Sequence, residues 1–265
     1  MTAEPAEDVD SSEDAEPTAP AGRRPGGDPI VTAEGVGHAF DGVSVLDGID
    51  VAVDGCSMTA LVGPNGSGKT TLLRIVAGLL APDDGQVRVR AAGQRPLGFL
   101  PQEPTFRGGF TVGETIDFYA ELLEASVDRD AVLERVGLDV VTGRRVDALS
   151  GGMLRLLGLA VAMLGDPPLV VLDEPASGLD PKIRAHVFEA IGRLADEDRA
   201  VLLATHHLQG AELADRVIVL DRGAVVADGP PDELLAATGA DSLEAAFLQS
   251  VSEGLAVQAG TEGSE

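Results

Sequence analysis

Short apolar runs recur along the chain, and most of them have the length of a β-strand rather than of a helix. They predict strands over residues 43–53, 58–63, 86–90, 97–101, 169–173, 200–205 and 216–220. The runs LVVL and VLLA contain no polar residue, which is typical of strands that are buried on both faces. We therefore expect an α/β fold with a largely parallel sheet that helices cover on both sides.

Between most of these runs, apolar residues recur every three or four positions, which indicates helices. The pattern predicts helices over residues 69–80, 115–125, 130–137 and 181–195, and one that begins after Ser150. From about 105 to 165 the pattern is helical without strands. We expect this segment to form a helical subdomain inserted into the α/β core.

The two ends of the chain lack such patterns. Residues 1–29 are acidic and proline-rich with almost no large apolar side chain, so they are expected to form a disordered acidic tail. Residues 249–265 are expected to form a flexible C-terminal tail. One folded domain is thus predicted over residues 30–248.

Length and composition fit a cytoplasmic globular protein. The chain has 265 residues, and its hydrophobic content of 44% is enough for a large core. The run 156–164 is far shorter than the roughly 20 apolar residues that span a bilayer, and the N-terminus lacks the pattern of a signal peptide. The single cysteine, Cys56, allows no internal disulfide.

The charge argues against nucleic acid as a partner, because a formal net charge of −25 repels a phosphate backbone. Lysine occurs only at Lys69 and Lys182, and the other basic residues are arginine. Two hypotheses account for this composition: adaptation to a salt-rich cytoplasm, as in a halophile-like acidic protein, and an arginine-biased genome. Full stability without salt would argue against the first.

The most specific motif is GPNGSGKTT, which matches G-x-x-x-x-G-K-[ST] between a predicted strand and a predicted helix. Its glycines let backbone N–H groups turn towards an anion, and the helix adds its positive end. Lys69 would reach the β- and γ-phosphates of ATP, and Thr70 would offer a hydroxyl to Mg²⁺. The candidate nucleotide-binding residues are Gly63, Pro64, Asn65, Gly66, Ser67, Gly68, Lys69, Thr70 and Thr71.

A second motif, LVVLDEPASGLDP, is an apolar strand that ends in two carboxylates. Asp173 is placed to hold Mg²⁺, and Glu174 is placed to polarise an attacking water as a general base. No site for a phosphate acceptor is signalled, so the pair favours hydrolysis over kinase chemistry.

A third stretch, ALSGGM, precedes a long apolar helix. Ser150 can cap this helix, while Gly151 and Gly152 leave its N–H groups uncovered for a phosphate.

These motifs, together with FLPQE, SGLD and ATHHL, occur in the order found in the ATP-binding subunits of ABC transporters, and the chain resembles that family over about 30–248. The resemblance implies a P-loop NTPase core with a mixed, largely parallel sheet, an N-terminal antiparallel β subdomain and an inserted helical subdomain. It also implies ATP and Mg²⁺ as cofactors.

The resemblance also implies roles for residues outside the phosphate loop. Gln102 would bind the metal and sense the attacking water, and His206 would contact the γ-phosphate, with its neighbour His207 left open as an alternative. Phe40 would stack on adenine, although an ordinary aromatic of the fold remains an alternative. Asp180 would lie at a subunit interface and couple two sites.

Members of the family sandwich ATP between two subunits, so Ser150, Gly151 and Gly152 are expected to face ATP held by a second copy or a related subunit. A separate permease would provide the membrane pathway, and it would dock on residues 102–119, which could instead be a mobile loop. This places the chain on the inner face of the membrane.

Met153 replaces a glutamine that many members have, and Val161 replaces a frequent arginine. Met153, EPASGLDP and SLEAAFLQ look most like the subfamily that serves ABC-2-type export permeases, with import left open.

Two other functions remain in view. One is a soluble ATPase in translation, repair or cofactor assembly: the single phosphate loop opposes translation, and the short spacing between Gln102 and Leu149 opposes repair. The other is a nucleotide-gated binding protein, which the intact catalytic residues oppose.

Overall fold

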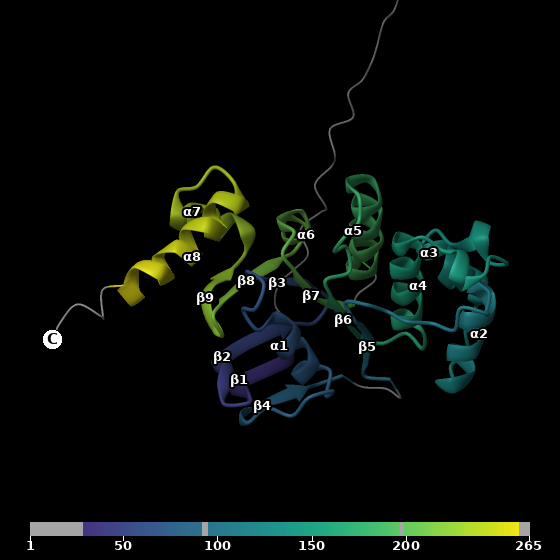
Figure 1. Ribbon diagram of the computed structural model, residues 1–265, viewed down its shortest axis with the longest axis horizontal. Coiled ribbons are helices and arrows are strands. Elements are labelled where there is room, and N and C mark those ends of the chain that lie inside the picture. The colour runs from purple at the N-terminus through teal and green to yellow at the C-terminus, as the bar shows by residue number, and fades with distance from the viewer. Residues whose placement is uncertain (1–28, 92–94, 197–198, 260–265) are drawn as a thin grey trace, which may run out of the picture.

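The computed structural model describes residues 29–91, 95–196 and 199–259 (Figure 1). The tail predicted over 1–29 lies outside these ranges except for Pro29, which begins the first strand.

A six-stranded sheet with the order β5-β6-β7-β3-β8-β9 forms the centre of the domain. Its strands are β3 (Met58–Val62), β5 (Leu97–Leu100), β6 (Leu169–Asp173), β7 (Ala200–Thr205), β8 (Arg216–Asp221) and β9 (Ala224–Gly229). Neighbours are parallel except for the antiparallel pair of β8 and β9. Every residue of β3, β6 and β7 is buried, as their continuous apolar runs predict.

The two faces of this sheet bury separate apolar cores, because successive side chains of a strand point to opposite sides. On one face, Leu61 and Val171 pack with helix α1 (Lys69–Val76) and with the N-terminal strands. On the other face, Ala60 and Val170 pack with α4 (Gly151–Met163) and α5 (Pro181–Asp196). Burial on both faces explains why the central strands are almost entirely apolar; their polar side chains are Thr59 and, at the strand ends, Asp173 and Thr205.

A separate antiparallel sheet, β2-β1-β4, confirms the expected N-terminal β subdomain. It consists of β1 (Pro29–Phe40), β2 (Val43–Asp54) and β4 (Asp84–Val89), and it lies beside α1 in Figure 1. The apolar pattern does not predict β1, because glycines and irregular pairing with β2 interrupt its alternation. It also misses β9, whose side chains are only partly buried.

The segment between β5 and β6 is helical, as predicted. It contains α2 (Val112–Leu122), α3 (Arg129–Arg135), the 3₁₀ turns η1 (Asp139–Val141) and η2 (Val146–Ala148), and α4. These helices form a group on one side of the domain (Figure 1). A capping box at Thr111 and Glu114 starts α2, since each residue satisfies a backbone N–H of the other.

The C-terminal part of the chain contains α6 (Leu208–Glu212), α7 (Pro231–Thr238) and α8 (Leu243–Ala259). Within the segment expected to be a flexible tail, 249–265, α8 continues through residue 259, and residues 260–265 lie outside the described ranges. Leu243, Phe247 and Val251 recur at helical spacing and pack against the core, which explains why the helix extends beyond 248. Among the described helices, none has both the length and the apolarity needed to cross a membrane.

Candidate functional site

The phosphate loop connects β3 to α1, and its backbone requires glycine at specific points. Gly66 and Gly68 have φ angles of +84° and +104°, which side chains other than glycine rarely adopt. A Cβ on Gly63 would lie 2.1 Å from the carbonyl oxygen of Leu220. The glycines therefore let the chain turn tightly and lie close to β8, which leaves the N-terminus of α1 open to a ligand.

Lys69 is the first residue of α1, and its side chain is folded back into this loop. Its Nζ donates hydrogen bonds to the carbonyl oxygens of Gly63 (2.8 Å) and Pro64 (3.0 Å) and lies 3.9 Å from Oε1 of Glu174. Burial lowers the pKa of Lys69, and the charges of Glu174 and Asp173 oppose that shift. A buried ammonium at the centre of the loop is suited to bind the phosphates of a nucleotide.

Asp173, at the end of β6, lies beside the first turn of α1. The hydroxyl of Thr70 donates to Oδ1 of Asp173 at 3.0 Å. Burial raises the pKa of the Asp173 carboxyl, although the Thr70 hydrogen bond lowers it. A hydroxyl and a carboxylate are hard oxygen donors of the kind that Mg²⁺ uses together with substrate phosphates, so these two residues fit that ion. The described residues contain no cluster of three His, Cys, Asp or Glu side chains that would form an all-protein site.

The raised pKa of Asp173 leads to a stability prediction. A carboxyl whose folded-state pKa lies above the unfolded value favours unfolding once pH rises through that range and the group ionises. Asp173→Asn removes this buried charge and keeps an acceptor for Thr70. We expect the nucleotide-free variant to melt a few degrees higher at pH 7.5, since about 1 kcal/mol shifts Tm by about 2–4 °C in a domain of this size. Thermal denaturation by circular dichroism measures it, and a lower Tm would contradict the argument.

Glu174 and His206 come together from the ends of the neighbouring strands β6 and β7. Nδ1 of His206 lies 2.8 Å from Oε2 of Glu174, and the backbone N–H of His206 lies 3.4 Å from the same oxygen. Glu174 has a φ of +47°, an uncommon conformation for a non-glycine residue, and its N–H donates to the carbonyl of Ala204. The strained backbone and the ring contact hold this buried carboxylate at the edge of the sheet.

His207 occupies a different environment. Its N–H donates to Oγ1 of Thr205, its ring centroid lies 4.0 Å from that of His206, and burial lowers its pKa. Of the two histidines, His206 is the one in contact with Glu174. This contact supports the preference for His206, for which the ATHHL motif had left His207 open as an alternative.

A cavity of about 580 Å³ joins these groups, and its size suits a nucleotide. Its lining contains half of the predicted site residues: Asn65, Gly66, Gly68, Lys69, Thr70, Thr71, Gln102, Glu174 and His206. Val45 and Ser177 also line the cavity and were not predicted. Ser177 lies within the SGLD motif, which could have signalled it, whereas Val45 carries no chemical signal.

Phe40 does not line this cavity. It is 47% exposed at the end of β1 and pairs with the exposed Val43 across the turn to β2. Val45, which lies two residues after Val43 in β2, does line the cavity. Phe40 therefore lies on the strand pair that borders the cavity, with much of its ring open to solvent.

The ALSGGM stretch and Asp180 also lie outside this cavity. Ser150 caps α4, since its Oγ accepts the N–H of Met153 at 3.3 Å. Asp180 caps α5 in the same manner, since its Oδ1 accepts the N–H groups of Lys182 and Ile183. Within one chain, both residues act as helix caps.

The structure distinguishes the two glycines of this stretch. Gly152 is buried, and a Cβ there would lie 2.3 Å from Cγ2 of Ile183 on α5, so this glycine allows the two helices to pack closely. Gly151 is exposed, and its nearest neighbour for a Cβ is Leu179 at 3.9 Å. Gly151 therefore leaves the start of α4 open on its side-chain face, whereas Gly152 packs against α5, and the role of both toward a partner's phosphate stays a prediction.

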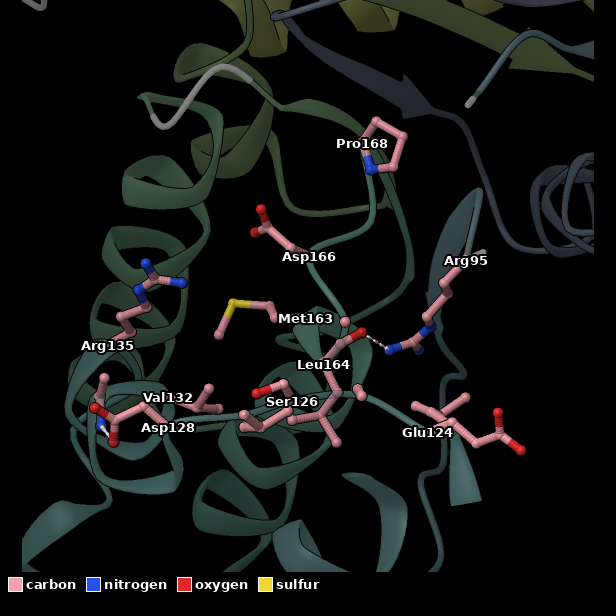
Figure 2. Close-up of a pocket in the computed structure, with 15 residues that line it drawn as sticks. Arg95, Glu124, Ser126, Asp128, Val132, Arg135, Met163, Leu164, Asp166 and Pro168 are labelled. Carbon is pink, nitrogen blue, oxygen red and sulfur yellow. Dashed lines mark hydrogen bonds between the residues drawn. The ribbon is translucent and has the colours of Figure 1, made fainter. Parts of the chain in front are cut away.

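A second cavity, of about 510 Å³, lies between the α2–α3 connection and the end of α4 (Figure 2). Arg95 points toward the end of α4 and donates hydrogen bonds to the carbonyl oxygens of Val161 and Leu164. Asp166 forms an ion pair with Arg199. These groups are committed to contacts within the protein, so this cavity offers no comparable chemistry.

The sequence of this chain is similar to those of known transport ATPases. Residues 46–177 match the family described as ABC transporter. The chain is 34% identical over 244 residues to a daunorubicin resistance ATP-binding protein of Streptomyces coeruleorubidus, covering 87% of the chain and 77% of that relative. It is 34% identical over 230 residues to the Nod factor export ATP-binding protein I of Ralstonia nicotianae, covering 82% and 72%.

Solved structures show the same fold. The ATP-binding subunit of an ABC transporter superposes with a TM-score of 0.73 at 24% identity, covering 83% of this chain and 99% of that one. A bacterial ABC transporter cassette solved as a dimer superposes with a TM-score of 0.67 at 21% identity, covering 76% and 98%.

Proposed function

The chain belongs to the ATP-binding subunits of the ABC transporter family, and on this premise we propose that it hydrolyses ATP to power a separate export permease. The observation that carries the proposal is the pair of Glu174 and His206 beside Lys69 in one nucleotide-sized cavity. A base, a residue that orients it and a phosphate-binding ammonium are the groups that ATP hydrolysis requires.

The residues divide the work of hydrolysis as follows. Lys69 exchanges the loop carbonyls for the β- and γ-phosphate oxygens, and the N–H groups of the glycine-rich loop bind the remaining phosphate charge. Glu174 accepts the proton of the attacking water through Oε1, while Oε2 stays bound to His206. This arrangement fixes the direction of the base before the substrate arrives.

Thr70, Asp173 and Gln102 would hold Mg²⁺, which when bound neutralises charge on the β- and γ-phosphates. The direct contact of Thr70 with Asp173 supports the first two, because Mg²⁺ would be shared between their oxygens. Gln102 lines the cavity from the segment that leads into the helical subdomain. It therefore joins the nucleotide to the part of the protein that faces a permease.

We propose that two ATP-binding subunits, identical or related, sandwich ATP between them. Ser150, Gly151 and Asp180 lie outside the chain's own cavity and are exposed, which supports their use towards a partner. The open start of α4 at Gly151 would then face the γ-phosphate held by the Lys69 of the second subunit.

The permease would dock on a shallow aromatic groove of about 180 Å³ in the helical subdomain. Phe106, Phe110, Phe118 and Tyr119 line it, and the Arg107 guanidinium lies 4.7 Å from the centroid of the Phe118 ring. An aromatic groove whose lining begins three residues after Gln102 in the chain is suited to an amphipathic helix at the cytoplasmic face of a membrane protein. The subunit would thus be peripheral to the inner face of the membrane.

Phe118→Ala tests this docking site. We expect ATP hydrolysis by the isolated subunit to stay unchanged, and its stimulation by the permease in membrane vesicles to fall about thirtyfold, since a central aromatic anchor contributes about 2 kcal/mol or more to an interface. Leu122→Ala, on the same helix and 66% exposed, is the matched control. Equal losses for the two variants would contradict a groove-specific role.

Export as the direction rests on the subfamily motifs and on relatives named for daunorubicin resistance and Nod factor export. Affinity capture of the tagged chain from detergent-solubilised membranes tests the transport role. Recovery of a multi-span membrane protein supports it, whereas recovery of ribosomes or soluble assembly factors alone would favour the non-transport ATPase.

A further inference from the structure

His38 is a buried polar residue that the reaction described above does not use. Its side chain is 8% exposed, and neither ring nitrogen has a hydrogen-bond partner among the described residues. Buried polar atoms in native proteins are nearly always hydrogen-bonded, so such an imidazole requires an explanation. Its neighbours indicate one.

The first neighbour is Phe40, the expected adenine platform. The two ring centroids lie 4.6 Å apart with an interplanar angle of 81°, the edge-to-face geometry in which the positive edge of one aromatic ring meets the negative face of the other. The remaining surface of Phe40 is open, since the residue is 47% exposed. His38 thus supports one side of the ring and leaves room for a planar ligand.

The second neighbour is Asp83, which contacts three consecutive residues before Phe40. Its N–H donates to the carbonyl of Gly37 at 2.9 Å, and its Oδ2 accepts the N–H of Ala39 at 2.7 Å. The same Oδ2 lies 3.2 Å from Nδ1 of His38, an ion-pair distance that lacks hydrogen-bond geometry. One aspartate therefore holds the backbone before the platform by hydrogen bonds and lies against the imidazole of His38.

The strand needs such a support at this point. Pairing between β1 and β2 shifts register between Val36 and His38 and again between His38 and Ala39, so the regular ladder does not determine the direction of the following side chain. Asp83 comes from the loop that follows α1, the helix that begins at the phosphate loop. It therefore connects the end of β1 to the element that binds the phosphates.

We infer that His38 and Asp83 are positioning residues that hold Phe40 in place to stack on the purine ring of the nucleotide, without touching the nucleotide themselves. The inference rests on the proposed ATP-binding function and on the stacking role of Phe40. An exposed phenylalanine held in one orientation loses less side-chain freedom when the base binds, so a support of this kind raises affinity for the base but not for the phosphates.

This difference provides the test. Isothermal titration of the full chain measures the Kd of ATP and of inorganic tripolyphosphate for the parent, Phe40→Ala, His38→Leu and Asp83→Ala. Asp84→Ala is the matched control, because no hydrogen bond or ion pair of its carboxylate occurs within the described part of the chain. We expect Phe40→Ala to weaken ATP binding about tenfold, as for loss of one base-stacking aromatic, and the two positioning variants to weaken it about threefold.

Tripolyphosphate affinity is expected to stay within twofold of the parent in all of these variants, and Phe40→Ala/His38→Leu is expected to bind ATP no more weakly than Phe40→Ala alone. Parent-like ATP binding by both His38→Leu and Asp83→Ala would overturn the inference and leave the proposed ATPase intact. Unchanged ATP binding by Phe40→Ala would also overturn it. Equal weakening of ATP and tripolyphosphate would mean that the residues only support the fold. If His38→Leu does not fold, the ATP affinity of Asp83→Ala alone tests the inference.

Discussion

Glu174→Gln is expected to lower the rate of ATP hydrolysis at least about a hundredfold while ATP binding stays unchanged. The substitution keeps the size of the side chain but removes the carboxylate that would accept the proton of the attacking water, and general-base catalysis of this kind contributes about 10²–10⁴ to a rate. The hydrogen bonds of Lys69 go to the loop carbonyls of Gly63 and Pro64 and not to Glu174, so the substitution is expected to preserve the phosphate site.

Phosphate release by the purified subunit at saturating ATP measures this effect, and titration with ATP checks binding. His206→Ala is expected to follow Glu174→Gln in direction, because Nδ1 of His206 lies 2.8 Å from the carboxylate. His207→Ala is the control with little expected effect, since the contacts described for it involve Thr205 and its histidine neighbour. Hydrolysis by Glu174→Gln at the parent rate would exclude Glu174 as the base.

Gly151→Asp is expected to abolish ATP-driven dimerisation without weakening the isolated chain. A side chain at this exposed position meets only Leu179, at 3.9 Å, and an acidic residue in the first turn of a helix is favourable. The new carboxylate would instead repel the γ-phosphate that a second subunit presents to the start of α4. Dimer formation is measured by light scattering after chromatography with ATP, in the Glu174→Gln background that slows hydrolysis.

Gly152→Ala distinguishes this interface effect from damage to the fold. Its Cβ would lie 2.3 Å from Cγ2 of Ile183, and overpacking of this kind destabilises a domain by about 1–3 kcal/mol. We therefore expect a lower Tm for Gly152→Ala and a parent-like Tm for Gly151→Asp. Normal dimerisation of Gly151→Asp would reduce the ALSGGM stretch to a helix start with no role towards a partner.

The fold was largely predictable because its central strands are buried on both faces and therefore read as uninterrupted apolar runs. β6 and β7 lie at the predicted residues for this reason. The elements that were missed are those whose burial is partial or whose alternation is broken. β1 contains bulges and glycines, β9 is only partly buried, and α6 spans only five residues.

The extension of α8 past residue 248 was missed for a related reason. Its apolar residues are separated by small and polar ones, and they become a recognisable face only against the core that they cover.

The candidate site also has a part that the sequence predicted and a part that only the tertiary structure brings together. The phosphate loop is a local structure: its turns follow from consecutive glycines and its helix start from the residues that come next, so a short motif is enough to predict it. Asp173 and Glu174 were identified because they end an apolar strand. Their partners Thr70 and His206 reach them from other elements, and only the packing of β6 against α1 and β7 brings those side chains together.

Identical residues in one motif were separated only by the tertiary structure. Gly151 and Gly152 are equivalent in sequence, yet only Gly152 lies against a side chain of α5. The ATHHL motif favours His206 and leaves His207 open, and of the two it is the ring of His206 that contacts Glu174. The local order of residues determines backbone turns and helix starts. Contacts between distant segments depend on how the sheet and helices pack. The contacts of His38 with Asp83 and with the Phe40 ring include one of this second kind, since Asp83 comes from the loop after α1.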